Sequence, residues 1–242
     1  MKILLPTLMA LLLNTALLAA NAAEKRTMLH LTYTAETKVE RDVFITPDAL
    51  KIASNSGMTL VAKAPKWEAC ISNTKAKKMF RIPYARWKQL GVGIIESDLE
   101  APKADQKVSS SPQVLGLSTV HYRSYATISD DYYRTRGKPK KGVVDFFGTT
   151  AFPLTDLQRQ LFAFWIGVPM TKELPILWGW TFENGQKRYV LQLLAWKQEP
   201  YNEHAFDEPT NYTMAHDTRE VYLATSTDAL KDMFETELQE HK

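Results

Sequence analysis

The sequence predicts a mainly β domain of the α+β class, in which helices cover an antiparallel sheet. Three observations predict it: short strand-like segments separated by turn residues, two segments whose apolar residues recur at helical spacing, and a wide hairpin rich in aromatic residues. Connections between the first strands are too short for crossover helices, so neighbouring strands are expected to run antiparallel.

The N-terminus has the features of a cleaved secretory signal. A short basic start precedes the mostly apolar residues 3–20, and Ala20-Asn21-Ala22 has the spacing of a cleavage site. We predict a signal peptide over residues 1–22, cleaved near Ala22 or Ala23, and a single periplasmic domain over residues 23–242. An uncleaved anchor is the alternative, but the run is shorter than a comfortable bilayer span of about 20 apolar residues.

Composition excludes several classes of protein. Cys70 is the only cysteine, so no disulfide can form within the chain, and we expect this thiol to be a small buried apolar group. The chain has 30 basic and 27 acidic residues; removing the signal takes Lys2 away and leaves 29 and 27, a net charge of +2. This balance, with export, predicts no nucleic-acid partner and no integral membrane protein.

The first half of the domain is predicted to be a meander of short strands. Turn residues such as Asn55-Ser56-Gly57 separate the strands. The predicted strands are Met28 to Glu36, Asp42 to Thr46, Ala49 to Ser54, Met58 to Lys63, Trp67 to Asn73 and Lys78 to Ile82. A short helix from Tyr84 to Leu90 and a polar loop from Glu96 to Gln113 are expected to follow.

The second half resumes with strands and then changes period. Alternation predicts strands from Leu117 to Ile128, from Gly142 to Thr149 and from Glu220 to Ala224. An apolar stripe predicts a helix from Thr155 to Ile166, with Thr155 and Gln158 at capping-box spacing and Gly167 as its stop. Leu230, Met233, Phe234 and Leu238 predict a C-terminal amphipathic helix.

The hairpin around Asn184-Gly185 is the most informative segment. Asn-Gly favours a type I′ turn, which would place Trp180 opposite Tyr189 and Trp178 opposite Leu191. With a side-chain period of two, the hairpin would then present one broad apolar face, formed by Trp178, Trp180, Phe182, Tyr189, Leu191 and Leu193.

The segment from Glu173 to Tyr212 resembles the closing half of LolA-like half-barrel domains, the family of periplasmic lipoprotein carriers and outer-membrane lipoprotein-sorting proteins. The likeness rests on Leu174-Pro175-Ile176, the Asn-Gly hairpin and Phe206-Asp207-Glu208-Pro209-Thr210-Asn211-Tyr212, in this order; Thr46 to Trp87 is similar to the family's opening meander. The resemblance implies a strongly curved antiparallel half-barrel, whose concave face holds lipid or acyl chains for transport. The chain departs from the family at its mature N-terminus, which enters a strand instead of an amphipathic helix. The helix from Thr155 to Ile166 and the C-terminal helix also have no obvious equivalents in the carriers.

These observations predict a non-catalytic protein that binds an apolar ligand. The expected ligand-binding residues lie on the hairpin and on the first long helix: Trp178, Trp180, Tyr189, Leu191, Leu193, Leu161, Phe164 and Trp165. The same residue types also build an ordinary sealed core. In that case the protein is expected to be an interaction or regulatory module with a periplasmic protein partner.

A basic cluster follows the strand at Ile128. It consists of Arg134, Arg136, Lys138, Lys140 and Lys141. The cluster could receive an anionic lipid headgroup or an acidic partner, or it is simply a solvated hairpin tip.

Sequence motifs of catalysis and metal binding are missing. No nucleophile elbow, phosphate loop or zinc spacing is present, so we predict no enzyme, no cofactor and no metal, and a secreted hydrolase is disfavoured. His204 near Asp207 and Glu208, and His216 beside Asp217, could act as ligands only if their loop folded back; exposed polar residues are the simpler interpretation.

Overall fold

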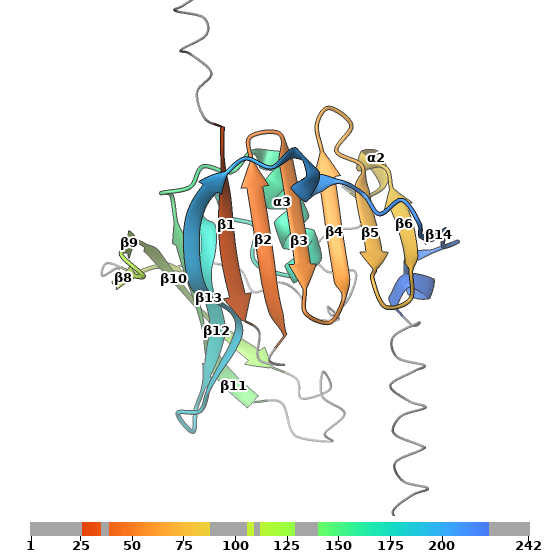
Figure 1. The fold of residues 1–242 in the computed structure, drawn as a ribbon. Coiled ribbons are helices and arrows are strands. Elements are labelled where there is room, and N and C mark those ends of the chain that lie inside the picture. Colours follow the sequence, from red (N-terminus) through yellow and green to blue (C-terminus); the bar gives the residue numbers. More distant parts are fainter. Residues whose placement is uncertain (1–25, 35–38, 88–105, 109–111, 129–139, 223–242) are drawn as a thin grey trace, which may run out of the picture.

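The computed structural model describes residues 26–34, 39–87, 106–108, 112–128 and 140–222 (Figure 1). The first group of elements is β1 (Thr27–Thr34), β2 (Glu40–Thr46), β3 (Ala49–Ser54), β4 (Met58–Lys63), β5 (Ala69–Asn73), β6 (Lys78–Ile82) and α2 (Tyr84–Trp87). The second group is β7 (Gln106–Lys107), β8 (Gln113–Val114), β9 (Leu117–Ser118), β10 (Val120–Ile128), β11 (Lys140–Thr149), α3 (Asp156–Ile166), β12 (Leu174–Phe182), β13 (Lys187–Pro200), the 3-10 helix η2 (Glu203–Phe206) and β14 (Thr213–Met214).

One large sheet organises the described residues. Its twelve strands follow the order β14-β6-β5-β4-β3-β2-β1-β13-β12-β11-β10-β7, while β8 and β9 form a small separate ribbon. The predicted meander is confirmed, because β1 to β6 pair in sequence order and antiparallel. In Figure 1, β10, β11 and β12 are inclined to β2–β6, which is the twist that a large open sheet accumulates.

The expected strongly curved antiparallel half-barrel is wrong. The sheet is open and mixed, because β14 returns from the C-terminal side of the chain and pairs parallel with β6. Strand periodicity reports which side chains share a face. Strand periodicity does not indicate how strongly a sheet twists or curves, nor which short segment forms its edge strand.

Most predicted elements agree with the structure, and three do not. The strand expected from Leu117 to Ile128 is divided into β9, in the small ribbon, and β10, in the large sheet. The bounds of β3, β4 and β6 are as expected, but residues 218–222 are helical where a strand was predicted from Glu220. The predicted loop from Glu96 to Gln113 contains β7 and the start of β8. The signal peptide and the C-terminal helix at Leu230 lie outside the described residues.

Helix α3 begins and ends where its caps predict. The Thr155 hydroxyl accepts from the Gln158 backbone N–H at 3.3 Å, and the Thr155 N–H donates to Gln158 Oε1 at 2.9 Å. Gly167 takes the left-handed conformation with φ +74° and donates to Ala163 O. The buried Gln158 amide also donates to Thr46 O at 2.6 Å, which fixes α3 to the end of β2.

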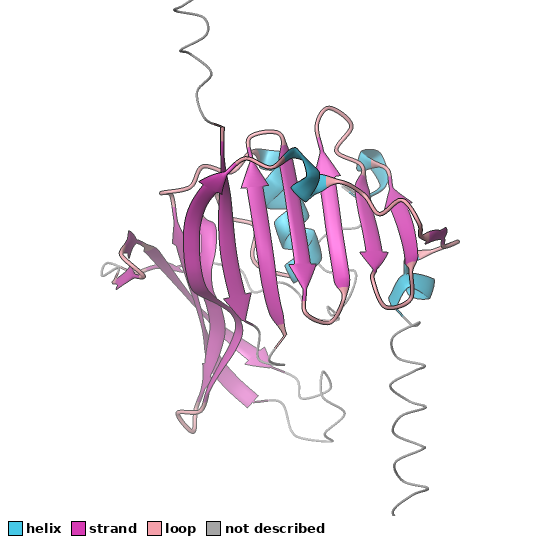
Figure 2. Cartoon of the chain, viewed as in Figure 1, coloured by secondary structure: helices cyan, strands magenta, loops and turns pink. Residues whose placement is uncertain are grey.

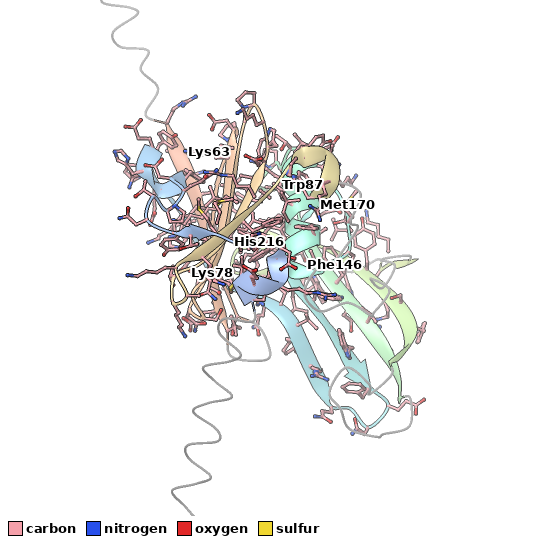
Figure 3. All side chains as sticks on the ribbon, turned by 90° about the vertical axis from the view of Figure 1, so that its right-hand side faces the viewer. Lys63, Lys78, Trp87, Phe146, Met170 and His216 are labelled. Carbon is pink, nitrogen blue, oxygen red and sulfur yellow. The ribbon has the colours of Figure 1, made fainter. Side chains whose placement is uncertain are left out.

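The two faces of the sheet are covered differently. Helices α2 and α3 lie on one side, the interior face, where they share a core with alternate residues of the strands (Figure 2). Segment η2 lies on the opposite side and packs Phe206 with Met28, Ala49 and Val61. Lys51 supports this packing by donating to Ala205 O at 2.8 Å. Figure 3 places Trp87 and Phe146 on the α3 side and Lys63 on the other.

Candidate functional site

The turn between β12 and β13 sets the register of the candidate site. The Phe182 N–H donates to Gln186 O at 2.9 Å, so three residues, Glu183 to Gly185, form the loop. Gly185 has φ +79°, whereas Asn184 does not have a positive φ, so the expected type I′ turn is wrong. A three-residue loop with glycine in the left-handed region is the other common hairpin connection.

This loop shifts the strand pairing by one residue close to the turn. Trp180 pairs with Arg188, and Gly179 pairs with Tyr189, so the predicted Trp180–Tyr189 pair is wrong. A bulge between Trp178 and Gly179 then restores the register, and the predicted Trp178–Leu191 pair is confirmed.

The hairpin therefore has two unlike faces. Its interior side chains are buried, and we call them the hairpin wall: Trp178, Trp180, Phe182, Leu191 and Leu193. Tyr189 belongs to the other face and is 37% exposed. A Cβ atom on Gly179 would lie 2.9 Å from Tyr189 Cδ1 and 2.3 Å from Arg188 O, so only glycine fits at this pairing.

Strands β11 and β10 extend the hairpin wall. Phe146 and Val144 pair with Trp178 and Trp180, and both are buried in the same core. Tyr122 pairs with Phe146, and their ring centroids are 6.1 Å apart. The result is an apolar, aromatic surface that crosses four neighbouring strands of the sheet.

The predicted helix residues contribute to this core from another direction. Leu161, Phe164 and Trp165 of α3 are buried in the same cluster as the hairpin wall. Their ring contacts, however, go elsewhere: Phe164 packs against Trp87 at 6.2 Å, and Trp165 against Tyr222 at 6.1 Å. Trp178 and Trp180 instead contact each other. The predicted ligand-binding residues other than Tyr189 therefore share one core, but the aromatic rings of α3 and those of β12 make their ring contacts in different parts of it.

The two indoles of the hairpin wall have unusual polar chemistry. Their ring centroids are 5.6 Å apart in an edge-to-face arrangement, and both Nε1–H groups are buried without a hydrogen-bond partner among the described residues. Two other indoles are satisfied: Trp87 donates to Trp67 O at 2.8 Å, and Trp196 donates to Leu115 O at 3.2 Å. Buried donors normally find partners, so the Trp178–Trp180 pair stands out.

A buried carboxylate lies at the far end of β12. Glu173 is 2% exposed; its Oε1 accepts from the Tyr122 hydroxyl at 3.1 Å, and its Oε2 has no partner among the described residues. Burial, and then the nearby Glu173 charge, raise the pKa of Tyr122. Glu173, Arg159 and Met170 also line a cavity of about 10 Å³, which has room for about one water molecule.

The sequence did not predict the Glu173–Tyr122 pair, nor a second polar cluster formed by His121, Arg123 and Asp145. On the other face, His121 Nε2 lies 2.6 Å from Asp145 Oδ1, and Arg123 Nε donates to the same oxygen at 2.9 Å. His121 stacks on Phe147 with centroids 4.1 Å apart. His121 and Arg123 are two residues apart on β10 and so share a face, but Asp145 joins them only through the pairing of β10 with β11, which no local pattern reveals. No serine, threonine or cysteine hydroxyl or thiol is hydrogen-bonded to His121 in the described part of the chain.

The other polar candidates do not form a site. His204 Nδ1 lies 2.9 Å from Asp207 Oδ2 on an exposed turn, while Glu208 pairs with Arg81 at 2.6 Å. No group of three metal-ligating side chains occurs among the described residues. Cys70 is buried, as expected, and burial raises the pKa of its thiol to about 12.

Only part of the predicted basic cluster can be placed. Lys140 and Lys141 begin β11, where they pair with Ile128 and Thr127. Arg134, Arg136 and Lys138 lie outside the described residues.

Comparison with known proteins leaves the family open. No family model and no curated protein matches the chain. Among solved structures, an uncharacterized conserved protein from Thermus thermophilus aligns with a TM-score of 0.41 and 11% identity, over 84% of this chain and 97% of that one. In addition, none of the described helices has the length and apolar character needed to cross a bilayer.

Proposed function

We propose that this chain is a periplasmic, non-catalytic binding protein that holds lipid or acyl chains against the hairpin wall. The observation that carries the proposal is the continuous apolar surface formed by Trp178 and Trp180 of β12, Leu191 and Leu193 of β13, and Phe146 of β11. Large aromatic and aliphatic side chains on adjacent strands are the usual lining of sites for apolar ligands.

The energetics of burial are sufficient for such a ligand. Each methylene removed from water contributes about 0.8 kcal/mol, so about ten buried methylenes contribute about 8 kcal/mol before the entropy of association is subtracted. A micromolar dissociation constant corresponds to about 8 kcal/mol. Longer acyl chains therefore supply useful affinity without a charged anchor.

Binding at this surface requires the core to open. Trp178 is 5% exposed and Trp180 is 7% exposed, so an acyl chain must part the hairpin wall from the side chains packed on it. The proposal extends to export through the predicted signal peptide and to kinship with the LolA-like carriers, which the order of the Leu-Pro, Asn-Gly and Phe-to-Tyr motifs supports.

A second candidate function is a periplasmic protein-interaction module. The burial of the hairpin wall favours it, because a sealed core needs no ligand. Tyr125 and Tyr189 add exposed aromatic surface on the opposite face of β10 and β13, at 75% and 37% exposure. Exposed aromatic side chains are enriched where proteins bind each other.

Uptake of a fluorescent fatty acid by delipidated protein tests the first function. We expect saturable binding, at least tenfold weaker in Trp180→Asp than in the wild type. Trp196→Ala is the matched control, because Trp196 is 38% exposed and lies outside the hairpin wall. Circular dichroism checks that both variants fold. Absence of saturable uptake by the folded wild type would contradict lipid binding and leave the interaction module.

A further inference from the structure

We propose that the ligand bound at the hairpin wall carries acceptor oxygens, a carboxylate or an ester carbonyl, that bind the indole N–H groups of Trp178 and Trp180. This inference rests on the proposed function and specifies the ligand's chemical class. It predicts that the oxygen-bearing end of the amphiphile lies inside the core, at the indole pair, and that the acyl chain follows the apolar wall.

The geometry of the indole pair supports this assignment. Trp178 and Trp180 are two residues apart on β12, so both side chains project from the interior face of the sheet. Their rings are in contact, with centroids 5.6 Å apart and planes at 65°, and both buried Nε1–H groups lack a partner among the described residues. Two adjacent donors match a head group whose oxygen atoms can accept two hydrogen bonds, as those of a carboxylate or a carbonyl can.

Two other buried donors of the core have partners, unlike the Trp178 and Trp180 N–H groups, for which the described residues provide none. Trp87 is buried more deeply, at 1% exposure, and its N–H donates to Trp67 O. Tyr33 is fully buried, and its hydroxyl donates to Pro175 O at 2.8 Å. A permanently sealed core would be expected to satisfy Trp178 and Trp180 in the same way, because an unpaired buried donor is destabilising.

The chemistry of the donors excludes head groups that have no acceptor atom. An indole N–H donates and cannot accept, so an ammonium group, which has no acceptor atom, leaves both indoles unpaired. A bare hydrocarbon does the same. A carboxylate or carbonyl accepts from both, and hydrogen bonds to a charged acceptor are about twice as strong as neutral ones.

The experiment compares amphiphiles that share one chain and differ in the head. Dodecanoate, methyl dodecanoate and dodecyltrimethylammonium are titrated into the delipidated full-length protein and into the Trp178→Phe, Trp180→Phe and Trp196→Phe variants. Phenylalanine keeps an aromatic ring and removes the N–H. Trp196→Phe is the control, because its indole is already paired with Leu115 O. Indole N–H resonances of ¹⁵N-labelled protein report the contact directly.

We expect dodecanoate to bind at least tenfold more tightly than dodecyltrimethylammonium, and the advantage to fall about tenfold in Trp178→Phe and Trp180→Phe but not in Trp196→Phe. Methyl dodecanoate distinguishes a carbonyl from a carboxylate. If it also binds more tightly than dodecyltrimethylammonium, a carbonyl is enough; if it does not, a carboxylate is required. The two indole resonances should move downfield with the acid.

Two results would overturn the inference. Equal affinity for the acid and the ammonium in all variants, with unmoved indole resonances, would show that water satisfies these donors; the proposed function would survive. Binding of none of the three amphiphiles would refute both.

Discussion

The meander of β1–β6 and the hairpin region of β10–β13 are built from the same kind of strand but differ in regularity. The strands of the meander pair with one another without a register shift, and their interior residues, such as Leu50, Ile52 and Ile71, are fully buried. The hairpin region contains register shifts at Phe147/Gly148 and Trp178/Gly179. It also holds the buried polar atoms of Trp178, Trp180 and Glu173 that have no partner among the described residues. Under the proposed function, the meander is the scaffold and the hairpin region is the part that binds the ligand.

The largest expected effect lies in the meander. Ile52 is completely buried, so Ile52→Ala removes its apolar contacts and leaves a cavity. We expect the free energy of unfolding to fall by about 2–5 kcal/mol, measured by urea denaturation. A decrease of less than about 1 kcal/mol in the free energy of unfolding would show that the meander packs loosely. The meander and the hairpin region would then not differ in the way described.

The second effect concerns the bulge of the hairpin. Gly179→Ala places a Cβ atom against the backbone of Arg188 and the ring of Tyr189, so the strands must separate locally. We expect the free energy of unfolding to fall by about 1–3 kcal/mol. Tryptophan fluorescence should also change, because Trp178 and Trp180 flank residue 179. Wild-type stability and fluorescence in this variant would mean that the bulge does not hold the hairpin wall in place.

A matched pair of substitutions then isolates the unpaired indoles. Trp87→Phe and Trp178→Phe remove the same atoms. Within the described part of the chain, only the first breaks a hydrogen bond, and it leaves a buried carbonyl, Trp67 O, without its donor. We expect Trp87→Phe to be more destabilising by at least about 1 kcal/mol in thermal or urea unfolding. Equal losses would indicate that the Trp178 N–H is satisfied in solution.

The smallest effect is the titration of the exposed pair on the segment that follows β13. The hydrogen bond to Asp207 raises the pKa of His204 above its ordinary value of 6.5, and the same bond lowers the pKa of Asp207. The histidine contribution to stability is therefore complete below pH 6.5 and is lost as pH rises through the raised pKa. The aspartate contribution exists above its ordinary pKa of 3.8 and is lost as pH falls through the lowered pKa.

An NMR titration of His204 checks this prediction. Asp207→Asn should return the pKa of His204 toward 6.5 and leave the fatty-acid affinity unchanged, because the pair lies on the face opposite the hairpin wall. A weaker fatty-acid affinity in this variant would show that the two faces of the sheet are coupled. It would contradict the view that the His204–Asp207 pair is independent of the hairpin wall.

The sequence predicted the elements better than their assembly. Alternation located β3, β4 and β6, and capping residues located α3, because these signals are local. The sheet's shape and its parallel edge strand depend on contacts between distant segments, such as Thr213 with Lys78, that leave no local pattern. The turn shows the same limit: Asn184-Gly185 marked the hairpin, but its actual geometry moved Tyr189 to the other face.

The candidate site follows the same rule. Clustered Trp, Phe and Leu residues predicted the hairpin wall, since burial follows residue type and strand period. Glu173 and Asp145 were not predicted, because a carboxylate in sequence carries no sign that folding will bury it beside Tyr122 or His121. Nor could composition reveal that the Trp178 and Trp180 N–H groups would lack partners among the described residues.

Lipid analysis of the protein isolated without detergent tests the central claim most directly. The protein is purified from a periplasmic fraction, extracted with organic solvent, and the extract is examined by mass spectrometry beside an extract of the Trp180→Asp variant. The account predicts an acyl-chain lipid in near-stoichiometric amount in the wild type and a strong reduction in the variant. A wild-type extract free of lipid, from folded protein that also fails to take up dodecanoate, would contradict it.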